Sequence, residues 1–125
     1  MALPQCPELQ GRRILIVEDE LLVAMDVEDL LEMQGCVVLG AASTIEEALI
    51  LIKSDKPEAV ILDRNLDGDR TTPVAEELNR VGIPFVVMTG YVSGIADEPA
   101  MRHALCVQKP WIPAELLKRL NEIFA

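Results

Sequence analysis

The sequence is short of aromatic residues, histidine and positive charge. Aromatic side chains make up 3% of the 125 residues, and there is a single histidine. With 11 basic against 21 acidic side chains, the formal net charge is −10. Nucleic acid and anionic membrane surfaces repel a chain of this charge, so we expect neither as a partner.

Long hydrophobic runs and paired cysteines are absent as well. No apolar run approaches the roughly 18 residues that a membrane span needs. The first residues also lack the basic start and apolar centre of a signal peptide. The three cysteines, Cys6, Cys36 and Cys106, have no paired spacing, which favours reduced thiols. These absences predict a cytoplasmic domain.

Hydrophobic residues are plentiful, at 50% of the chain, and they recur as short β-branched runs. A length of 125 residues fits one domain with one core. The runs are apolar on both alternating faces, as in strands of a parallel sheet that is covered on both sides. The expected strands are residues 14–17, 37–39, 59–62, 85–88 and 105–107.

The segments between these runs have helical spacing. One apolar stripe consists of Val23, Val27, Leu30 and Leu31, and a capping box at Thr44–Glu47 opens a second helix. A third helix begins at Thr72-Pro73 and stops at Gly82.

Two more helices complete the pattern. We expect a fourth helix between Val92 and Arg102, although Gly94 and Pro99 interrupt it. Ile112-Pro113 opens a final helix, whose expected inward residues are Leu116, Leu117, Leu120 and Ile123.

Five strands alternating with five helices predict a doubly wound α/β fold of (βα)5, flavodoxin-like type. Right-handed crossovers make 2-1-3-4-5 a common strand order for such a parallel five-stranded sheet. Residues 1–11 form a polar, proline-containing extension that need not be ordered, and residues 12–125 form the domain.

Chemically useful residues follow the strands. Glu18-Asp19 follow the first run, Asp63 the third, Thr89-Gly90 the fourth and Lys109-Pro110 the fifth. In an open parallel sheet the carboxyl edge binds ligands, so these side chains converge there. No other part of the sequence offers such a group.

Glu18, Asp19 and Asp63 would repel one another strongly in a partly desolvated cleft. A hard divalent cation relieves that repulsion, and Mg2+ suits the site because it needs few carboxylates and shares positions with phosphoryl oxygens. A backbone carbonyl just past Asp63, such as that of Asn65, completes the coordination. Thr89 and Lys109 then contact other phosphoryl oxygens, with Asp63 as the nucleophile.

These residues, in this order and at the strand ends, resemble the signature of response-regulator receiver domains from about Arg13 to Phe124. The resemblance implies that Asp63 accepts a phosphoryl group from a sensor histidine kinase or a histidine phosphotransfer protein. It also implies that Glu18 and Asp19 hold Mg2+, that Thr89, Gly90 and Lys109 form the phosphoryl-binding switch, and that the Lys109–Pro110 bond is cis.

The resemblance further implies a protein that is not an enzyme acting on a separate substrate. It predicts a single-domain regulator, a monomer or weak dimer, whose downstream target lies on a separate chain. The stretch from Pro84 to Tyr91 is similar to a subgroup that reads Pro-Phe-x-Phe-Ala-Thr-Gly-Tyr, although Val87 and Met88 depart from it.

Cys106 departs from the family pattern, in which an aromatic residue stands three positions before the lysine and turns inward on phosphorylation. A small thiol has no ring to turn. We therefore hypothesise that phosphorylation instead orders the segment from Tyr91 to Arg102, where glycine and proline make a poor helix.

Simpler interpretations compete with these. Asp19 can serve only as a helix cap, Asp67 and Asp69 are loop charges, and His103 is solvated. The acids after the first run would repel a flavin phosphate, and Asn65 cannot act as the general acid/base of a phosphohydrolase. A receiver-shaped binding module that acts independently of phosphorylation remains the alternative function.

Overall fold

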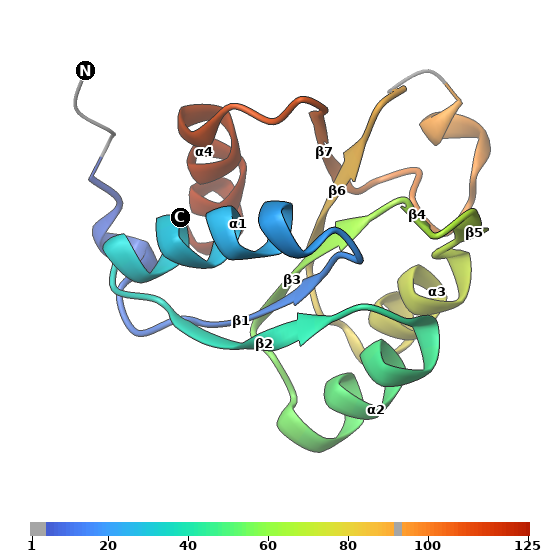
Figure 1. The fold of residues 1–125 in the computed structure, drawn as a ribbon, viewed down its shortest axis with the longest axis horizontal. Helices are drawn as coiled ribbons and strands as arrows, with labels where there is room; N and C mark the ends of the chain where they lie inside the picture. The colour runs from blue at the N-terminus through green and yellow to red at the C-terminus, as the bar shows by residue number, and fades with distance from the viewer. Residues whose placement is uncertain (1–4, 92–93) are drawn as a thin grey trace.

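A computed structural model describes residues 5–91 and 94–125 of the chain (Figure 1). The five apolar runs form one parallel sheet in the order β2-β1-β3-β6-β7, which confirms the predicted topology. In chain order the strands are β1 (Arg13–Val17), β2 (Val37–Ala42), β3 (Ala59–Asp63), β6 (Phe85–Thr89) and β7 (Leu105–Gln108).

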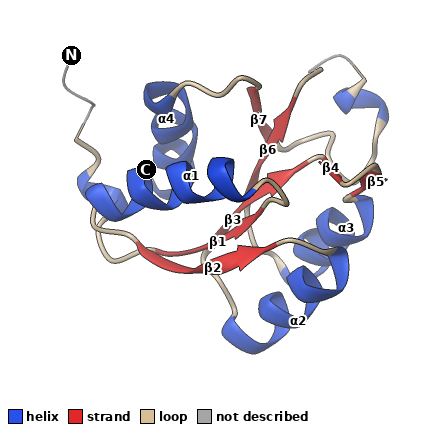
Figure 2. Ribbon diagram, viewed as in Figure 1, coloured by secondary structure: helices blue, strands red, loops and turns tan. Residues whose placement is uncertain are grey.

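Two helices cover each face of the sheet (Figure 2). On one face, α1 (Leu21–Met33) and α4 (Pro113–Phe124) bury Leu30, Leu31 and Leu116 against the sheet. On the other face, α2 (Ile45–Asp55) and α3 (Thr72–Val81) bury Ile52 and Leu78. The two apolar cores hold the sheet between them, and the polar groups lie at its carboxyl edge.

The predicted helix boundaries are accurate for α2 and α3. Thr44 caps α2, since its hydroxyl oxygen accepts a hydrogen bond from the Glu47 N–H at 3.1 Å. Gly82 ends α3 in the left-handed conformation, with a φ of 79°. Both helix ends could be predicted because a capping threonine and a terminating glycine are recognisable in the sequence.

The fourth helix, expected between Val92 and Arg102, is wrong for the residues that the structure describes; Val92 itself lies outside them. The chain there forms only a 3-10 turn, η2 (Ile95–Asp97), followed by further turns. Gly94 has a φ of +88°, which an α-helix does not allow, and Pro99 lacks an N–H donor. Ile95 and Met101 are nevertheless buried on the α2/α3 face, so this segment fills the place of a helix.

Two short elements were not predicted. The strands β4 (Asn65–Leu66) and β5 (Asp69–Arg70) form an antiparallel hairpin directly after β3. Its two connecting residues, Asp67 and Gly68, have φ values of 49° and 87°, the pattern of a tight hairpin turn. The hairpin carries Asn65 and Asp67 along the edge on which Asp63 lies.

Part of the extension expected over residues 1–11 belongs to the packed domain. A 3-10 turn, η1 (Pro7–Leu9), lies against α4, and Leu9 is fully buried in the core between α1 and α4. Cys6 is buried as well. Across residues 5–91 and 94–125, no helix combines the length and the apolar composition that a bilayer crossing requires.

Candidate functional site

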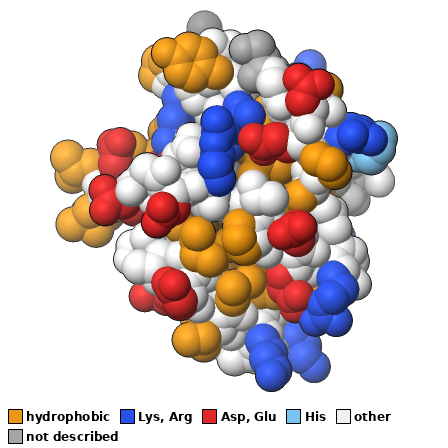
Figure 3. Space-filling model, turned by 90° about the vertical axis from the view of Figure 1, so that its right-hand side faces the viewer, with side chains coloured by type: hydrophobic (Ala, Val, Ile, Leu, Met, Phe, Trp, Pro, Cys, Tyr) orange, Lys and Arg blue, Asp and Glu red, His pale blue; other side chains and the backbone are white. Residues whose placement is uncertain are grey.

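Three carboxylates meet at the carboxyl edge of the sheet. Glu18 directly follows β1 and Asp63 ends β3; both are buried, while Asp19 is exposed. Each of these residues offers an oxygen, and the three oxygens lie within 4.8 Å of one another. Figure 3 looks onto this side of the molecule, where acidic, basic and hydrophobic side chains are interspersed. The structure therefore brings the three predicted acids together.

Lys109 supplies positive charge to this cluster. Its Nζ lies 2.8 Å from Oδ2 of Asp63 and 3.5 Å from Oε1 of Glu18. Burial disfavours the ammonium form, but the hydrogen bond and charge of Asp63, together with the charge of Glu18, outweigh it and raise the Lys109 pKa. The Lys109–Pro110 bond is cis. Lys109 therefore stays protonated beside Asp63.

One ammonium group does not balance three carboxylates. Burial of Glu18, together with its hydrogen bond to Asp63 and the charge of Asp63, raises its pKa to about 8, and Lys109 offsets this only in part. A buried carboxylate whose pKa is raised this far indicates that the cluster carries more negative charge than its surroundings stabilise. A further cation at this place would relieve it.

The hairpin after β3 fixes the position of two of the acids. Oδ2 of Asp19 accepts a hydrogen bond from the Asp67 N–H at 2.9 Å, and Oδ1 of Asp63 accepts one from the Asn65 N–H at 3.1 Å. The N-terminal cap of α1 is Glu20, and no side chain bonds to the helix end there. Capping of α1 therefore does not account for Asp19, whose carboxylate is held in the cluster instead.

The donor set fits a hard divalent cation. Carboxylate oxygens on three residues, one of them exposed to incoming water, are ligands that Mg2+ accepts, and it retains several waters at such sites. The fit rests on the oxygen chemistry and on the excess negative charge of the cluster. Asp67 and Asp69 are exposed on the hairpin and lie outside the three-acid group.

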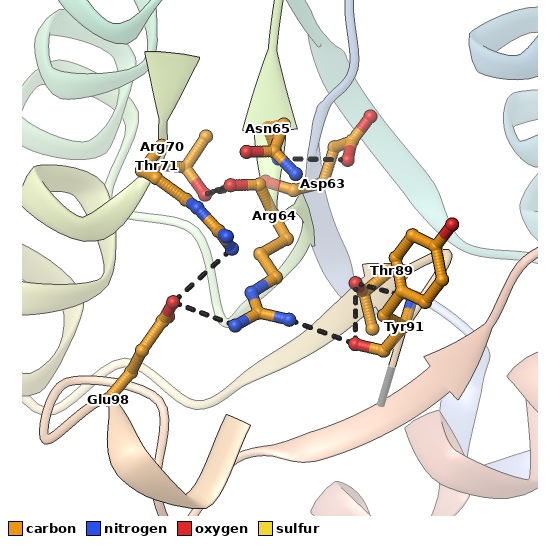
Figure 4. Close-up of polar contacts among 8 residues, drawn as sticks. All are labelled: Asp63, Arg64, Asn65, Arg70, Thr71, Thr89, Tyr91 and Glu98. Atoms are coloured by element: carbon orange, nitrogen blue, oxygen red, sulfur yellow. Dashed lines mark hydrogen bonds and ion pairs between the residues drawn. The ribbon is translucent and has the colours of Figure 1, made fainter. Parts of the chain in front are cut away.

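Thr89 lies at this edge, but its hydroxyl group is engaged elsewhere. The Thr89 Oγ1 accepts a hydrogen bond from the Tyr91 N–H at 3.2 Å and donates one to the Tyr91 carbonyl at 3.1 Å (Figure 4). The Lys109 N–H donates to the Thr89 carbonyl at 2.7 Å, which ties the ends of β6 and β7 together. Gly90 is exposed, with open space where a side chain would begin.

The sequence reasoning missed Arg64, the residue that follows Asp63. Its side chain is buried, and it donates to the Tyr91 carbonyl at 2.9 Å and to Oε1 of Glu98 at 2.8 Å. Successive residues of a strand point to opposite faces, so Asp63 lies on the face of Ile61, which packs with α1 and α4, and Arg64 on the face of Leu62, which packs with α2 and α3. Figure 4 shows the two side chains pointing away from each other. That alternation was the available signal, because it places the side chain of Arg64 on the opposite face of the sheet from Asp63.

Cys106 is half-buried on the same face as Arg64. Burial raises the pKa of its thiol, and the nearby charges of Arg64 and Arg119 oppose that shift. The face on which Cys106 stands in place of an aromatic residue therefore also holds the buried guanidinium group of Arg64. His103 is exposed, as expected.

Comparison with known proteins agrees with this geometry. The sequence model of the response regulator receiver domain matches residues 14–121. PdtaR, a transcriptional regulatory protein of Mycobacterium tuberculosis, is 36% identical over 116 residues, which cover 88% of this chain and 55% of PdtaR. The chain spans about half the length of the curated relatives it matches.

Solved structures give the same result. The crystal structure of the response regulator PhyR from Brucella abortus aligns with a TM-score of 0.81 and 30% identity, covering 94% of this chain and 50% of PhyR. The solution structure of SdrG from Sphingomonas melonis aligns with a TM-score of 0.77 and 37% identity, covering 94% of this chain and 98% of SdrG. The chain belongs to the response regulator receiver domain family.

Proposed function

We propose that this chain is a phosphorylation-controlled switch of two-component signalling, with Asp63 as the phosphoacceptor. The observation that carries the proposal is the placement of the buried Asp63 carboxylate between two further acids and the Lys109 ammonium, 2.8 Å away. The donor is the phosphohistidine of a sensor histidine kinase or of a histidine phosphotransfer protein.

The transfer requires little of the protein beyond positioning and charge. A carboxylate oxygen of Asp63 attacks phosphorus; the new P–O bond forms as the P–N bond to histidine breaks, and the electron pair returns to the imidazole nitrogen, which takes a proton from water. Lys109, already in contact with Asp63, neutralises charge on the phosphoryl oxygens.

Glu18, Asp19, Asp63 and the backbone carbonyl of Asn65 are the proposed Mg2+ ligands. When bound, the ion withdraws negative charge from the phosphoryl oxygens and so stabilises the transition state. The excess of carboxylates over cations among these residues supports the assignment.

Thr89 and Gly90 are the proposed phosphoryl-binding turn. The hydroxyl of Thr89 is available to a phosphoryl oxygen once it leaves Tyr91, to which it is bonded at 3.1 and 3.2 Å. Phosphorylation thereby changes the hydrogen bonding of the chain that follows β6. Thr89 therefore both stabilises the phosphoryl group and transmits its presence to Tyr91.

We infer that the output is a protein–protein interaction with a target on a separate chain, in the cytoplasm, made by a monomer or weak dimer. The net charge of −10 argues against a nucleic-acid target. A structural relative, PhyR of Bartonella quintana, is described as an anti-anti-sigma factor, which is a protein-directed role. The phosphoacceptor function includes slow, water-dependent loss of the phosphoryl group but no turnover of a separate substrate.

Treatment with acetyl phosphate and Mg2+, followed by intact-mass measurement, tests the proposal. The wild-type chain gains one phosphoryl group, Asp63→Asn gains none, and Asp67→Asn, which changes an exposed acid of the neighbouring hairpin, behaves as wild type. Removal of Mg2+ with a chelator prevents the gain.

The same variants distinguish the alternative, a binding module that acts independently of phosphorylation. Such a module keeps its partner and its cellular effect in the Asp63→Asn variant. If Asp63→Asn loses partner binding and the cellular effect, while Asp67→Asn retains both, the result supports the switch.

A further inference from the structure

The feature that the proposed function leaves unexplained is the buried cation beside the phosphoacceptor. Arg64 is 5% exposed and binds two groups that follow β6 in the chain, the Tyr91 carbonyl and the Glu98 carboxylate. Arg70 on β5 also reaches Oε1 of Glu98, at 3.3 Å, but its side chain is 53% exposed. Arg64 therefore fastens the segment of residues 94–104 to the end of the phosphoacceptor strand (Figure 4).

The Tyr91 carbonyl is shared between this cation and the proposed phosphoryl ligand. Arg64 Nη1 donates to it at 2.9 Å, and the Thr89 hydroxyl donates to it at 3.1 Å. The Tyr91 N–H in turn donates to the same hydroxyl at 3.2 Å. A phosphoryl group that draws the Thr89 hydroxyl away from Tyr91 therefore removes both of these Thr89 hydrogen bonds, and among the described residues it leaves the Tyr91 backbone with the hydrogen bond to Arg64.

The Arg64–Glu98 ion pair could form a second hydrogen bond. Among the described residues, Arg64 Nε and Glu98 Oε2 are buried and lack a hydrogen-bond partner, although they belong to the two side chains that form the pair. Arginine and carboxylate pair most strongly through two parallel hydrogen bonds. The contact with Tyr91 thus coexists with a one-point pair, while a two-point pair would satisfy both unpartnered atoms.

Two alternative arrangements of one buried cation make a switch element. We propose that Arg64 couples the state of Asp63 to residues 94–104: when the phosphoryl group captures the Thr89 hydroxyl, Arg64 leaves the Tyr91 carbonyl and binds Glu98 through both carboxylate oxygens. Arg64 is then a positioning residue that replaces the turning aromatic ring, on the face where Cys106 leaves none. The inference rests on the proposed function, because capture of Thr89 drives it.

The test follows the full chain with beryllofluoride and Mg2+ by NMR, and with acetyl phosphate and Mg2+ by mass. In the wild type the Arg64 Nε–H signal shifts and the Tyr91 amide exchanges faster. The hydrogen-bonded amides of Asp97, Glu98, Met101 and Ala104 exchange about tenfold more slowly, as expected when one charged hydrogen bond is added to their anchor.

Three variants separate coupling from folding. Glu98→Gln removes the charge and one acceptor, and Arg64→Lys keeps the charge but cannot make a two-point pair; both retain the gain in mass and lose the slowing in residues 94–104. Arg70→Gln removes the exposed partner of the same carboxylate and responds as wild type. Thermal unfolding confirms that each variant is folded.

The outcomes are distinct for the two proposals. If the wild type gains no phosphoryl group, the proposed function fails and the coupling fails with it. If the wild type gains the group while Glu98→Gln and Arg64→Lys slow their amides as much as it does, the coupling alone is overturned. An Arg64 Nε–H signal that stays unmoved by beryllofluoride in the wild type overturns it too.

Discussion

Asp63 and Arg64 are neighbours in the chain, yet they lie in opposite electrostatic environments. On the α1/α4 face, Asp63 joins two other carboxylates with one ammonium group. On the α3 face, Arg64 and Arg70 share the single carboxylate of Glu98. The first face has more carboxylates than cations, whereas the buried Arg64 of the second has its counter-charge within the chain. The end of β3 therefore has an acid cluster with excess negative charge on one side and the Arg64–Glu98 ion pair on the other.

The largest effect on stability is expected when the Arg64–Glu98 pair is removed. Glu98→Ala leaves the buried Arg64 guanidinium without its carboxylate, so the free energy of unfolding falls by about 3 kcal/mol. Urea denaturation measures the change. The matched control, Glu122→Ala, breaks the Arg119 pair, whose side chains are 33% and 39% exposed. It costs less than about 1 kcal/mol. Equal losses in the two variants would show that Arg64 needs no counter-charge.

The acid cluster predicts a pH dependence with a definite sign. The pKa of Glu18 is raised from 4.5 to about 8, so the folded chain holds a proton that the unfolded chain releases. In a chelator, stability therefore falls as the pH rises through this range, by about 2 kcal/mol. Glu18→Gln removes this part of the decline, which urea unfolding at pH 5.5 and pH 8 measures. A decline of the same size in both proteins would contradict the raised Glu18 pKa.

A smaller effect is expected at Thr89, the last residue of β6. Thr89→Ala removes both hydrogen bonds to Tyr91, and the Tyr91 amide exchanges about tenfold faster in the unmodified chain. Thr44→Ala, which removes the cap of α2, leaves that amide unchanged. An unaltered Tyr91 amide in Thr89→Ala would show that Arg64 alone holds the loop.

The sheet and the acid cluster could be predicted because they depend on local patterns. Runs apolar on both faces identify buried parallel strands, and the residues after such strands must share one edge. These two patterns predict that Glu18, Asp63 and Lys109 lie together. The contacts of Lys109 with both acids agree with it.

The Arg64–Glu98 pair and the conformation of residues 94–104 depend on long-range contacts that local sequence patterns do not reveal. Helical spacing favoured a fourth helix, but Gly94 adopts a left-handed conformation and Ile95 anchors a 3-10 turn instead. The pairing of Arg64 with Glu98 spans 34 residues, and only the strand alternation hints at its direction. Leu9, in an apparently polar extension, is buried because η1 packs against α4, which is a tertiary effect.

Titration of the metal-free chain with Mg2+, followed by carboxyl-detected NMR, tests most directly whether the acid face takes its missing charge from a bound ion. The account predicts saturable shifts of the Glu18, Asp19 and Asp63 carboxyl signals, with those of Glu98, Asp67 and Asp69 nearly unmoved. Signals of the three acids that stay in place, or shifts spread evenly over all the acidic residues, would contradict it.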